Sequence, residues 1–220
     1  MYMVKQNQAQ VAYNSILRDI KENKLSQGQP IIEEDYARSL GMSRTPVREA
    51  IRLLSVEGFV TVYPRKGAYV SVLTAQDIND CYEMMEAVEG MISYLAAHNP
   101  SKEHIKQLSE LIDRMDEAKR LMDFHKWKEY DMEFHKTLHN MCENKLLAYH
   151  WEKLFHKTYQ IQTNFVTGVN LEKANSEHKL ILDAISNQDQ EKARQYTQQN
   201  WSRARSEFLI HAHGDNLYAK

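Results

Sequence analysis

The sequence contains little glycine, proline or cysteine. Only 7 glycines and 4 prolines occur among 220 residues, less than half of the average usage of about 12%. A chain with so few turn residues is poorly suited to many short strands, which disfavours a turn-rich β protein. The two cysteines, Cys81 and Cys142, are far apart in the sequence. We therefore expect a cytoplasmic protein without disulfides.

Long apolar runs are also absent. No stretch approaches the roughly 20 apolar residues that a membrane-spanning helix needs. The first ten residues, MYMVKQNQAQ, lack the charged-then-apolar pattern of a secretory signal. With 42% hydrophobic and 26% charged residues, the composition is that of an ordinary globular protein. The sequence thus predicts a protein without a membrane partner.

The net charge is −2, which taken alone argues against a nucleic-acid partner. The charge is unevenly distributed, however. Residues 1–73 carry 10 basic and 7 acidic side chains, whereas the remainder of the chain carries 18 and 23. All 10 histidines lie in that second part. These differences predict two modules, over residues 1–73 and 77–220, joined by a linker at 74–76.

The first module has the pattern of a helix-turn-helix. Apolar residues at helical spacing predict helices over residues 10–24 and 33–40. Gly41 follows the second helix, where a residue that tolerates a positive φ is favourable. A third helix is predicted with Thr45 as its N-cap and Pro46 in its first turn.

The third predicted helix has an apolar face and a basic face. Its basic face carries Arg44, Arg48 and Arg52. In a helix-turn-helix this helix enters the major groove, where Arg48 can bind guanine O6 and N7. Phosphates or base edges would be held by Arg44 and by the hydroxyls of Ser43 and Thr45. The arginine spacing alone is more often that of a solvated helix face.

Two β-rich runs follow, at residues 59–63 and 68–73, and they flank Pro64-Arg65-Lys66-Gly67. This pattern predicts a hairpin wing with a basic tip, which adds Arg65 to the candidate DNA contacts. The run SRTPVREAIRLLSVEGFVTVYPRKGAYV resembles the winged helix-turn-helix of the GntR family of bacterial transcription regulators, and the resemblance extends over roughly residues 10–73. It implies DNA contacts from the following residues: Arg44, Thr45, Arg48, Lys66 and Gly67. Glu34 stands where some members carry a DNA-contacting arginine.

The second module is predicted to be entirely helical. Thr74 and Asp77 have the spacing of a capping box, so a helix should start there. Helical periodicity then continues almost to the end, interrupted near residues 99–101, 123–125, 143–145, 167–170 and 187–189. The fold class is therefore mainly α, with an N-terminal winged helix-turn-helix followed by an all-α bundle of about six helices.

Asp131 and His135 lie four residues apart on one predicted helix and could bind one cation from the same face. Such a pair is more often a surface or core-rim feature. The sequence has no His-Glu-x-x-His motif, glycine-rich phosphate loop or nucleophile elbow. We therefore expect a protein that is not an enzyme.

Residues 131–135, DMEFH, and 177–185, EHKLILDAI, resemble the FCD effector domain of the FadR branch of GntR regulators, over roughly residues 77–208. The resemblance implies a divalent metal, zinc, nickel or manganese, that receives a carboxylate effector. The implied ligands are Asp131, His135, His178 and the residue 22 positions further on, Asn200.

Two departures from the family pattern bear on this site. Asn200 replaces the usual fourth ligand, a histidine, and an amide oxygen is a harder and weaker donor for zinc or nickel than imidazole is. Met85 stands where relatives commonly carry an arginine that supports an acidic effector. Met85 and Glu89 are predicted to line the effector pocket.

The leading interpretation is a homodimeric transcription regulator, with repression as the family tendency. Its affinity for double-stranded operator DNA would be controlled by a small organic or sugar acid. Two alternatives remain open from the sequence. One is a metal-dependent enzyme that uses Asp131, His135 and His178, and the other is a winged-helix interaction module that senses no ligand.

Overall fold

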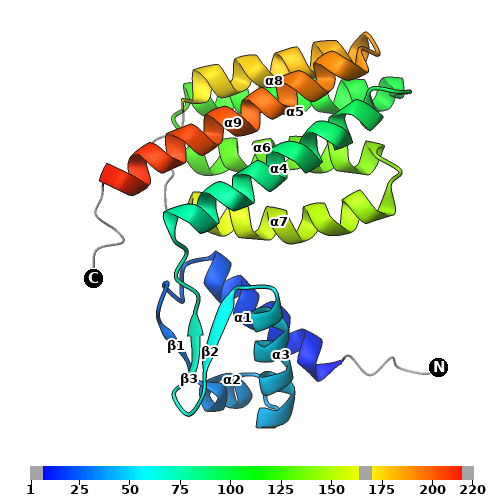
Figure 1. Ribbon diagram of the computed structural model, residues 1–220. Coiled ribbons are helices and arrows are strands. Elements are labelled where there is room, and N and C mark those ends of the chain that lie inside the picture. The colour runs from blue at the N-terminus through cyan, green and yellow to red at the C-terminus, as the bar shows by residue number, and fades with distance from the viewer. Residues whose placement is uncertain (1–6, 164–169, 215–220) are drawn as a thin grey trace, which may run out of the picture. The chain divides into compact units, whose positions relative to one another are not determined.

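The computed structural model describes residues 7–163 and 170–214, with side chains described outside 156–163 and 211–214. These residues form nine α-helices and three short β-strands (Figure 1). The chain divides into two compact units, and the division along the chain falls between Thr74 and Ala75. The predicted fold class, a winged helix-turn-helix followed by a helical bundle, is confirmed.

The first unit combines three helices with a small antiparallel sheet of strand order β1-β3-β2. Its elements are α1 (Gln8–Lys21), β1 (Pro30–Ile31), α2 (Glu33–Ser39), α3 (Arg44–Val56), β2 (Val60–Tyr63) and β3 (Gly67–Val70). The β2–β3 hairpin pairs Val60 with Val70 and Tyr63 with Gly67. It forms the predicted wing, although its strands are shorter than the predicted runs 59–63 and 68–73.

Two helix starts and one strand in this unit differ from the sequence-based expectation. α1 starts at Gln8 because the Asn7 side chain caps it and accepts a hydrogen bond from the Ala9 N–H. α3 starts at Arg44 with Ser43, not Thr45, as its N-cap, since the extended backbone of Ser43 (ψ 168°) already precedes the helix. β1 was not predicted, because a two-residue strand shows no alternation.

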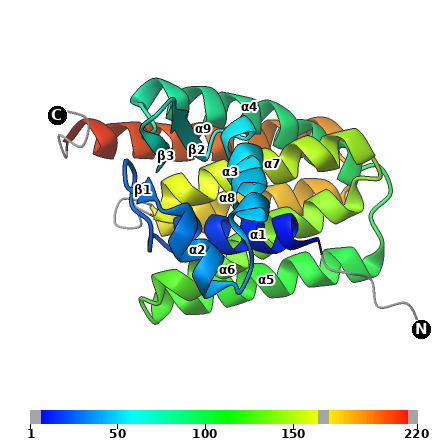
Figure 2. The same ribbon diagram turned by 90° about the horizontal axis from the view of Figure 1, so that it is seen from below.

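The apolar face of α3 fixes the orientation of its basic face. Val47, Ala50 and Leu54 are fully buried in the core of the first unit. There α3 packs against α1, which it crosses (Figure 2). Because residues at i, i+3 and i+7 occupy one side of a helix, burial of this side turns the arginine side outward.

The turn between α2 and α3 uses the predicted left-handed glycine. Gly41 has φ +63°, and its N–H donates to the Arg38 carbonyl at 3.3 Å. The next N–H, of Met42, donates to the Ala37 carbonyl at 3.0 Å. These bonds close the end of α2, so that α3 can start after a short turn.

The second unit is a bundle whose helices lie side by side in Figure 1. Its helices are α4 (Ala75–Ala96), α5 (Lys102–Arg120), α6 (Phe124–Met141), α7 (Lys145–Thr163), α8 (Leu171–Ser186) and α9 (Gln190–Gly214). The expected number of about six is confirmed for the described part of the chain, while residues 167–169 of one predicted break lie outside it. No described helix is long and apolar enough to cross a membrane.

Gly90 of α4 lies against a side chain of α9. A Cβ atom at this position would lie 2.7 Å from Cγ of Gln198 on α9, well inside van der Waals contact. The absence of a side chain at Gly90 therefore leaves room for the Gln198 side chain of α9. This contact brings the two longest helices among the described residues together along the bundle.

Replacing Gly41 by alanine should destabilise the helix-turn-helix by about 1 kcal/mol, because alanine is strained at positive φ. Nothing within 4 Å of the added Cβ would add a clash. Amide hydrogen exchange of α2 and α3 should therefore accelerate about fivefold. The matched control is Gly41→Asn, since asparagine tolerates this conformation better. Equal exchange in the alanine variant and the unmodified protein would contradict the expectation.

Candidate DNA-binding surface and metal-binding cluster

The N-terminal end of α3 is exposed. Ser43, Arg44, Thr45 and Arg48, four of the predicted DNA contacts, all have exposed side chains. The Ser43 hydroxyl makes no capping hydrogen bond to the helix. The first N–H groups of α3 and this hydroxyl are thus donors of the kind that hold a phosphate at a helix N-terminus.

Glu33, the first residue of α2, contacts two of these arginines. Its Oε2 atom accepts a hydrogen bond of 2.7 Å from Nε of Arg48 and lies 3.2 Å from a terminal nitrogen of Arg44. This role of Glu33 was not predicted from the sequence. The adjacent Glu34 pairs with Arg38 instead, at 3.4 Å.

The tip of the wing is compact and basic. Arg65 and Gly67 have positive φ values, +63° and +104°, and the Lys66 N–H donates to the Tyr63 carbonyl at 3.1 Å. The side chains of Arg65 and Lys66 are exposed. The hairpin therefore presents both cations at its end, as the sequence predicted.

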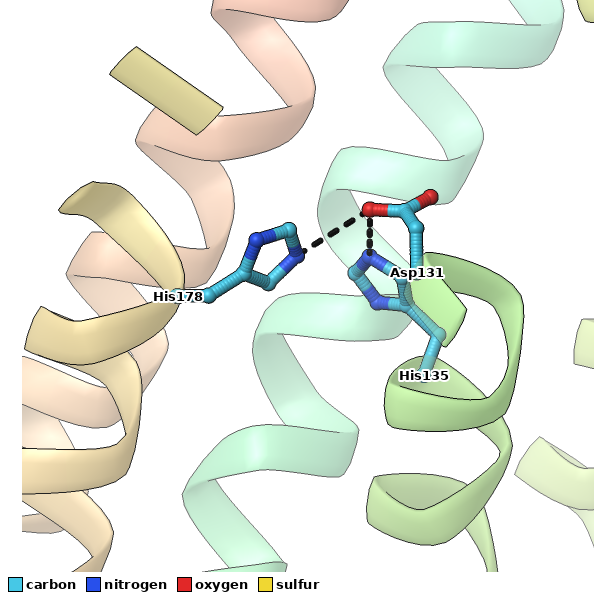
Figure 3. A group of neighbouring side chains, drawn as sticks. All are labelled: Asp131, His135 and His178. Carbon is cyan, nitrogen blue, oxygen red and sulfur yellow. Dashed lines mark ion pairs between the residues drawn. The ribbon is translucent and has the colours of Figure 1, made fainter. Parts of the chain in front are cut away.

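Asp131, His135 and His178 come together inside the bundle (Figure 3), with one potential ligand atom from each lying within 4.8 Å of the others. The Nε2 atoms of His178 and His135 lie 3.2 Å and 4.0 Å from Oδ1 of Asp131. The first two residues belong to α6 and the third to α8. Among the described residues, neither ring nitrogen of the fully buried His178 has a hydrogen-bond partner of suitable geometry.

A fully buried carboxylate of α4 lies beside His135. The Nδ1 atom of His135 is 3.3 Å from Oε2 of Glu89, and the Trp151 indole N–H donates to Oε1 of the same carboxylate. When the neutral ring donates Nδ1–H to Glu89, its lone pair is on Nε2, the nitrogen that lies 4.0 Å from Oδ1 of Asp131. Histidine ligands of metals are commonly oriented by a carboxylate in this way.

The electrostatic environment keeps Asp131 ionised. Burial acts to raise its pKa, but the rings of His178 and His135 and the guanidinium of Arg203 outweigh burial, and the pKa is lowered. Burial likewise acts to lower the pKa of His135, while Glu89 and Asp131 outweigh it and raise the pKa. The carboxylate of Asp131 and the imidazoles of His135 and His178 form a donor set that suits a divalent cation.

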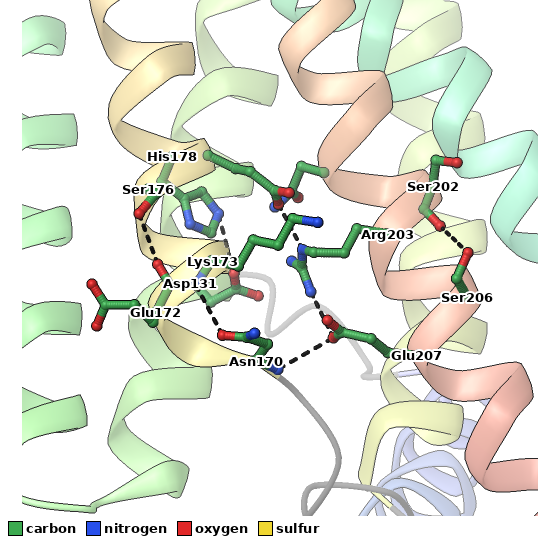
Figure 4. Close-up of polar contacts among 12 residues, drawn as sticks. Asp131, Asn170, Glu172, Lys173, Ser176, His178, Ser202, Arg203, Ser206 and Glu207 are labelled. Atoms are coloured by element: carbon green, nitrogen blue, oxygen red, sulfur yellow. Dashed lines mark hydrogen bonds and ion pairs between the residues drawn. The ribbon is translucent and has the colours of Figure 1, made fainter.

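Asn200, the fourth residue implied by the resemblance, is buried on α9. Its Nδ2 donates to Oε2 of Glu177 at 2.9 Å, so only its carbonyl oxygen remains as a potential ligand. Arg203 donates to the same Glu177 atom at 2.7 Å and to Glu207 at 2.6 Å. Figure 4 shows Arg203 beside Asp131 and His178. This pair of acidic contacts to Arg203 was not predicted.

The two residues predicted to line the effector pocket are both fully buried on α4. Glu89 uses both carboxylate oxygens for His135 and Trp151, so it supports the cluster. Met85 contributes an apolar side chain at the position where the family resemblance implies an arginine. The positive charge near Asp131 comes instead from Arg203 of α9.

Both halves of the chain match known families. Residues 80–203 match the FCD domain, and residues 8–70 match the family described as "Bacterial regulatory proteins, gntR family". The chain therefore belongs to the GntR family, in the group that carries an FCD domain. It is a transcription regulator with a DNA-binding winged helix-turn-helix and an effector-binding helical domain.

Curated relatives have corresponding names. A protein of Paenarthrobacter nicotinovorans named "Probable D-xylose utilization operon transcriptional repressor" is 29% identical over 178 residues, covering 81% of this chain and 78% of the relative. An HTH-type transcriptional regulator of Agrobacterium vitis is 36% identical over 130 residues, covering 58% and 76%. The transcriptional repressor RspR of Escherichia coli is 27% identical over 140 residues, covering 62% and 60%.

Solved structures share the fold. Escherichia coli McbR/YncC matches with a TM-score of 0.78 at 20% identity, covering 95% of this chain and 99% of the other. A GntR regulator from Rhodococcus sp. RHA1 matches with a TM-score of 0.72 at 20% identity, covering 92% and 97%. At this identity the likeness concerns the fold.

If His178 is a metal ligand, the variant His178→Ala should bind Zn²⁺, Ni²⁺ or Mn²⁺ at least about 10-fold more weakly, because one of three donors is lost. Isothermal titration calorimetry with each metal measures this change. His125→Ala is the matched control, since His125 is an exposed histidine at the start of α6, the helix that carries Asp131 and His135. Unchanged affinity in the His178 variant would reject the site.

Proposed function

We propose that this regulator is a homodimeric repressor in which residues 1–73 bind an operator and residues 77–220 bind a small acid that changes operator affinity. The observation that carries the DNA-binding part is the exposed N-terminal end of α3. There Ser43, Arg44, Thr45 and Arg48 stand together above a buried apolar face. Relatives named as repressors support repression.

In this proposal α3 lies in the major groove and the wing contacts the adjacent backbone. Arg48 reads a guanine, while Arg44 and the hydroxyls of Ser43 and Thr45 hold phosphates or base edges. Arg65, Lys66 and the exposed backbone at Gly67 approach phosphates from the tip of the hairpin. Positive φ at Gly67 supports the tight turn that this approach needs.

The effector site is proposed at the Asp131, His135 and His178 cluster. These three side chains would hold a divalent cation, zinc, nickel or manganese, with the Asn200 carbonyl oxygen as a further donor. When bound, such a cation supplies positive charge and open coordination positions for a carboxylate of an organic or sugar acid. Full burial of His178, whose Nε2 lies 3.2 Å from Oδ1 of Asp131, and orientation of His135 by Glu89 support this assignment.

Regulation requires that the effector bind one arrangement of the two DNA-binding units better than another, because equal affinity for both arrangements would shift nothing. In a dimer, the two DNA-binding units can adopt different arrangements relative to each other. It also places two copies of α3 on two half-sites, which raises specific affinity beyond what one short helix provides. We assign residues 77–220 to dimerisation as well as to sensing.

The Arg48→Ala variant should lose about 1–3 kcal/mol of specific binding and relax one base position, because a bidentate base contact is removed. Lys66→Ala should instead weaken binding to all sequences and reduce the salt dependence. Fluorescence anisotropy with a duplex selected by the unmodified protein, at several salt concentrations, separates the two effects. Arg52→Ala, one turn further along α3, is the control. An unchanged operator affinity in the Arg48 variant would show that α3 is not the reading helix.

Protein purified without an affinity tag or chelator should contain near-stoichiometric divalent metal per protomer, measured by elemental mass spectrometry. Dialysis against a chelator should remove the metal and lower the melting temperature, because a ligand that binds only the folded state stabilises it. No metal, even after incubation with zinc, nickel and manganese, would contradict the metal site. The search for an effector would then turn to less acidic ligands.

A further inference from the structure

Glu33, the first residue of α2, contacts the basic face of α3. Its Oε2 atom accepts a hydrogen bond from Nε of Arg48 at 2.7 Å and pairs with Arg44 at 3.2 Å. We propose that Glu33 determines DNA specificity by orienting both arginines and by weakening their attraction to unrelated DNA. The inference rests on the proposed DNA-reading role of Arg44 and Arg48.

The hydrogen bond from Nε of Arg48 to Glu33 determines which edge of the guanidinium group can bind a base. A guanidinium group presents its donors in a rigid planar fork, and its two terminal nitrogens can bind guanine O6 and N7 together. Because Nε of Arg48 faces Glu33, the edge that remains for DNA is the terminal one. The Arg48 side chain is 62% exposed, so in the absence of this contact its long chain would sample many rotamers.

The charge of Glu33 acts on binding that involves phosphates alone. Arg44 and Arg48 share one carboxylate, so the three side chains together carry one net positive charge instead of two. Affinity for DNA of any sequence rises with the number of phosphates that cationic groups neutralise. Neutralising Glu33 should therefore strengthen binding to random DNA, while loss of arginine orientation weakens recognition of the correct site.

The neighbouring acids provide an internal comparison. Glu34 and Asp35 lie in the same first turn of α2 and pair with Arg38, at 3.4 Å and 3.7 Å. Glu34 thus has the charge and nearly the location of Glu33, but its ion pair is with Arg38, whereas Arg44 and Arg48 pair with Glu33. The variant Glu34→Gln changes the net charge in the same way and is the matched control for Glu33→Gln.

The test uses the full-length protein and two duplexes of equal length, one selected by the unmodified protein from a random pool and one of random sequence. We expect Glu33→Gln to bind the random duplex about fivefold more tightly, with a steeper salt dependence. The ratio of affinities for the selected and random duplexes should fall about 10-fold. Glu34→Gln should change both affinities by a similar factor and keep the ratio. Circular dichroism checks that all variants remain folded.

Three results would overturn the inference. The first is an affinity ratio in Glu33→Gln that equals that of Glu34→Gln. The second is full retention of the ratio in Glu33→Asp, whose shorter side chain keeps the charge but draws it away from Arg48. The third is a further loss of ratio when Glu33→Gln is added to a variant that already lacks both arginine side chains, because Glu33 would then act on DNA directly.

Failure of the proposed function gives a different result. If Arg48→Ala alone keeps the affinity ratio of the unmodified protein, the assignment of α3 as the reading helix is wrong, whatever Glu33→Gln does. If Arg48→Ala loses the ratio and Glu33→Gln keeps it, the reading helix is retained and only the role of Glu33 is rejected.

Discussion

An ionised carboxylate inside a helical bundle must be surrounded by compensating groups, and the interior of the second unit is organised around this requirement. Asp131 faces His178 at 3.2 Å and lies near His135, while Arg203 adds positive charge from α9. His135 belongs to the same helix as Asp131, whereas His178 and Arg203 come from α8 and α9, further along the chain. The same interaction that keeps Asp131 ionised therefore ties α6, α8 and α9 together.

The first unit handles its charges differently, because they lie at the surface. The apolar residues of α3 are buried against α1, and the arginines are left in solvent, where Glu33 holds two of them. Exposed ion pairs of this kind contribute little to stability. Their value lies in arranging side chains before a ligand arrives, which lowers the conformational entropy lost on binding.

Local patterns in the sequence account for much of the fold. The period of Val47, Ala50 and Leu54 predicted α3, and Gly41 predicted the end of α2, because each depends on neighbours along the chain. The N-cap of α3 was misassigned between two suitable hydroxyl residues, since only the backbone conformation distinguishes Ser43 from Thr45. A strand of two residues such as β1 has no period to detect.

In the candidate sites too, local spacing predicted some residues, whereas contacts between distant parts of the chain were not predicted. Asp131 and His135 share a helix face by spacing alone, whereas His178 came from the family resemblance, because no periodicity joins α6 to α8. Glu33 and Glu89 were not assigned their contacts, since their partners Arg48 and His135 are 15 and 46 residues away. Only the folded chain brings these groups together.

Trp151 gives the bundle an optical property of its own. All three tryptophans of the chain lie in the second unit, and the indole of Trp151 donates to Glu89, which faces His135. The helix-turn-helix and its wing contain none. Tryptophan emission of this protein therefore originates entirely from the second unit, with one emitter separated from the candidate ligand-binding cluster by a single carboxylate.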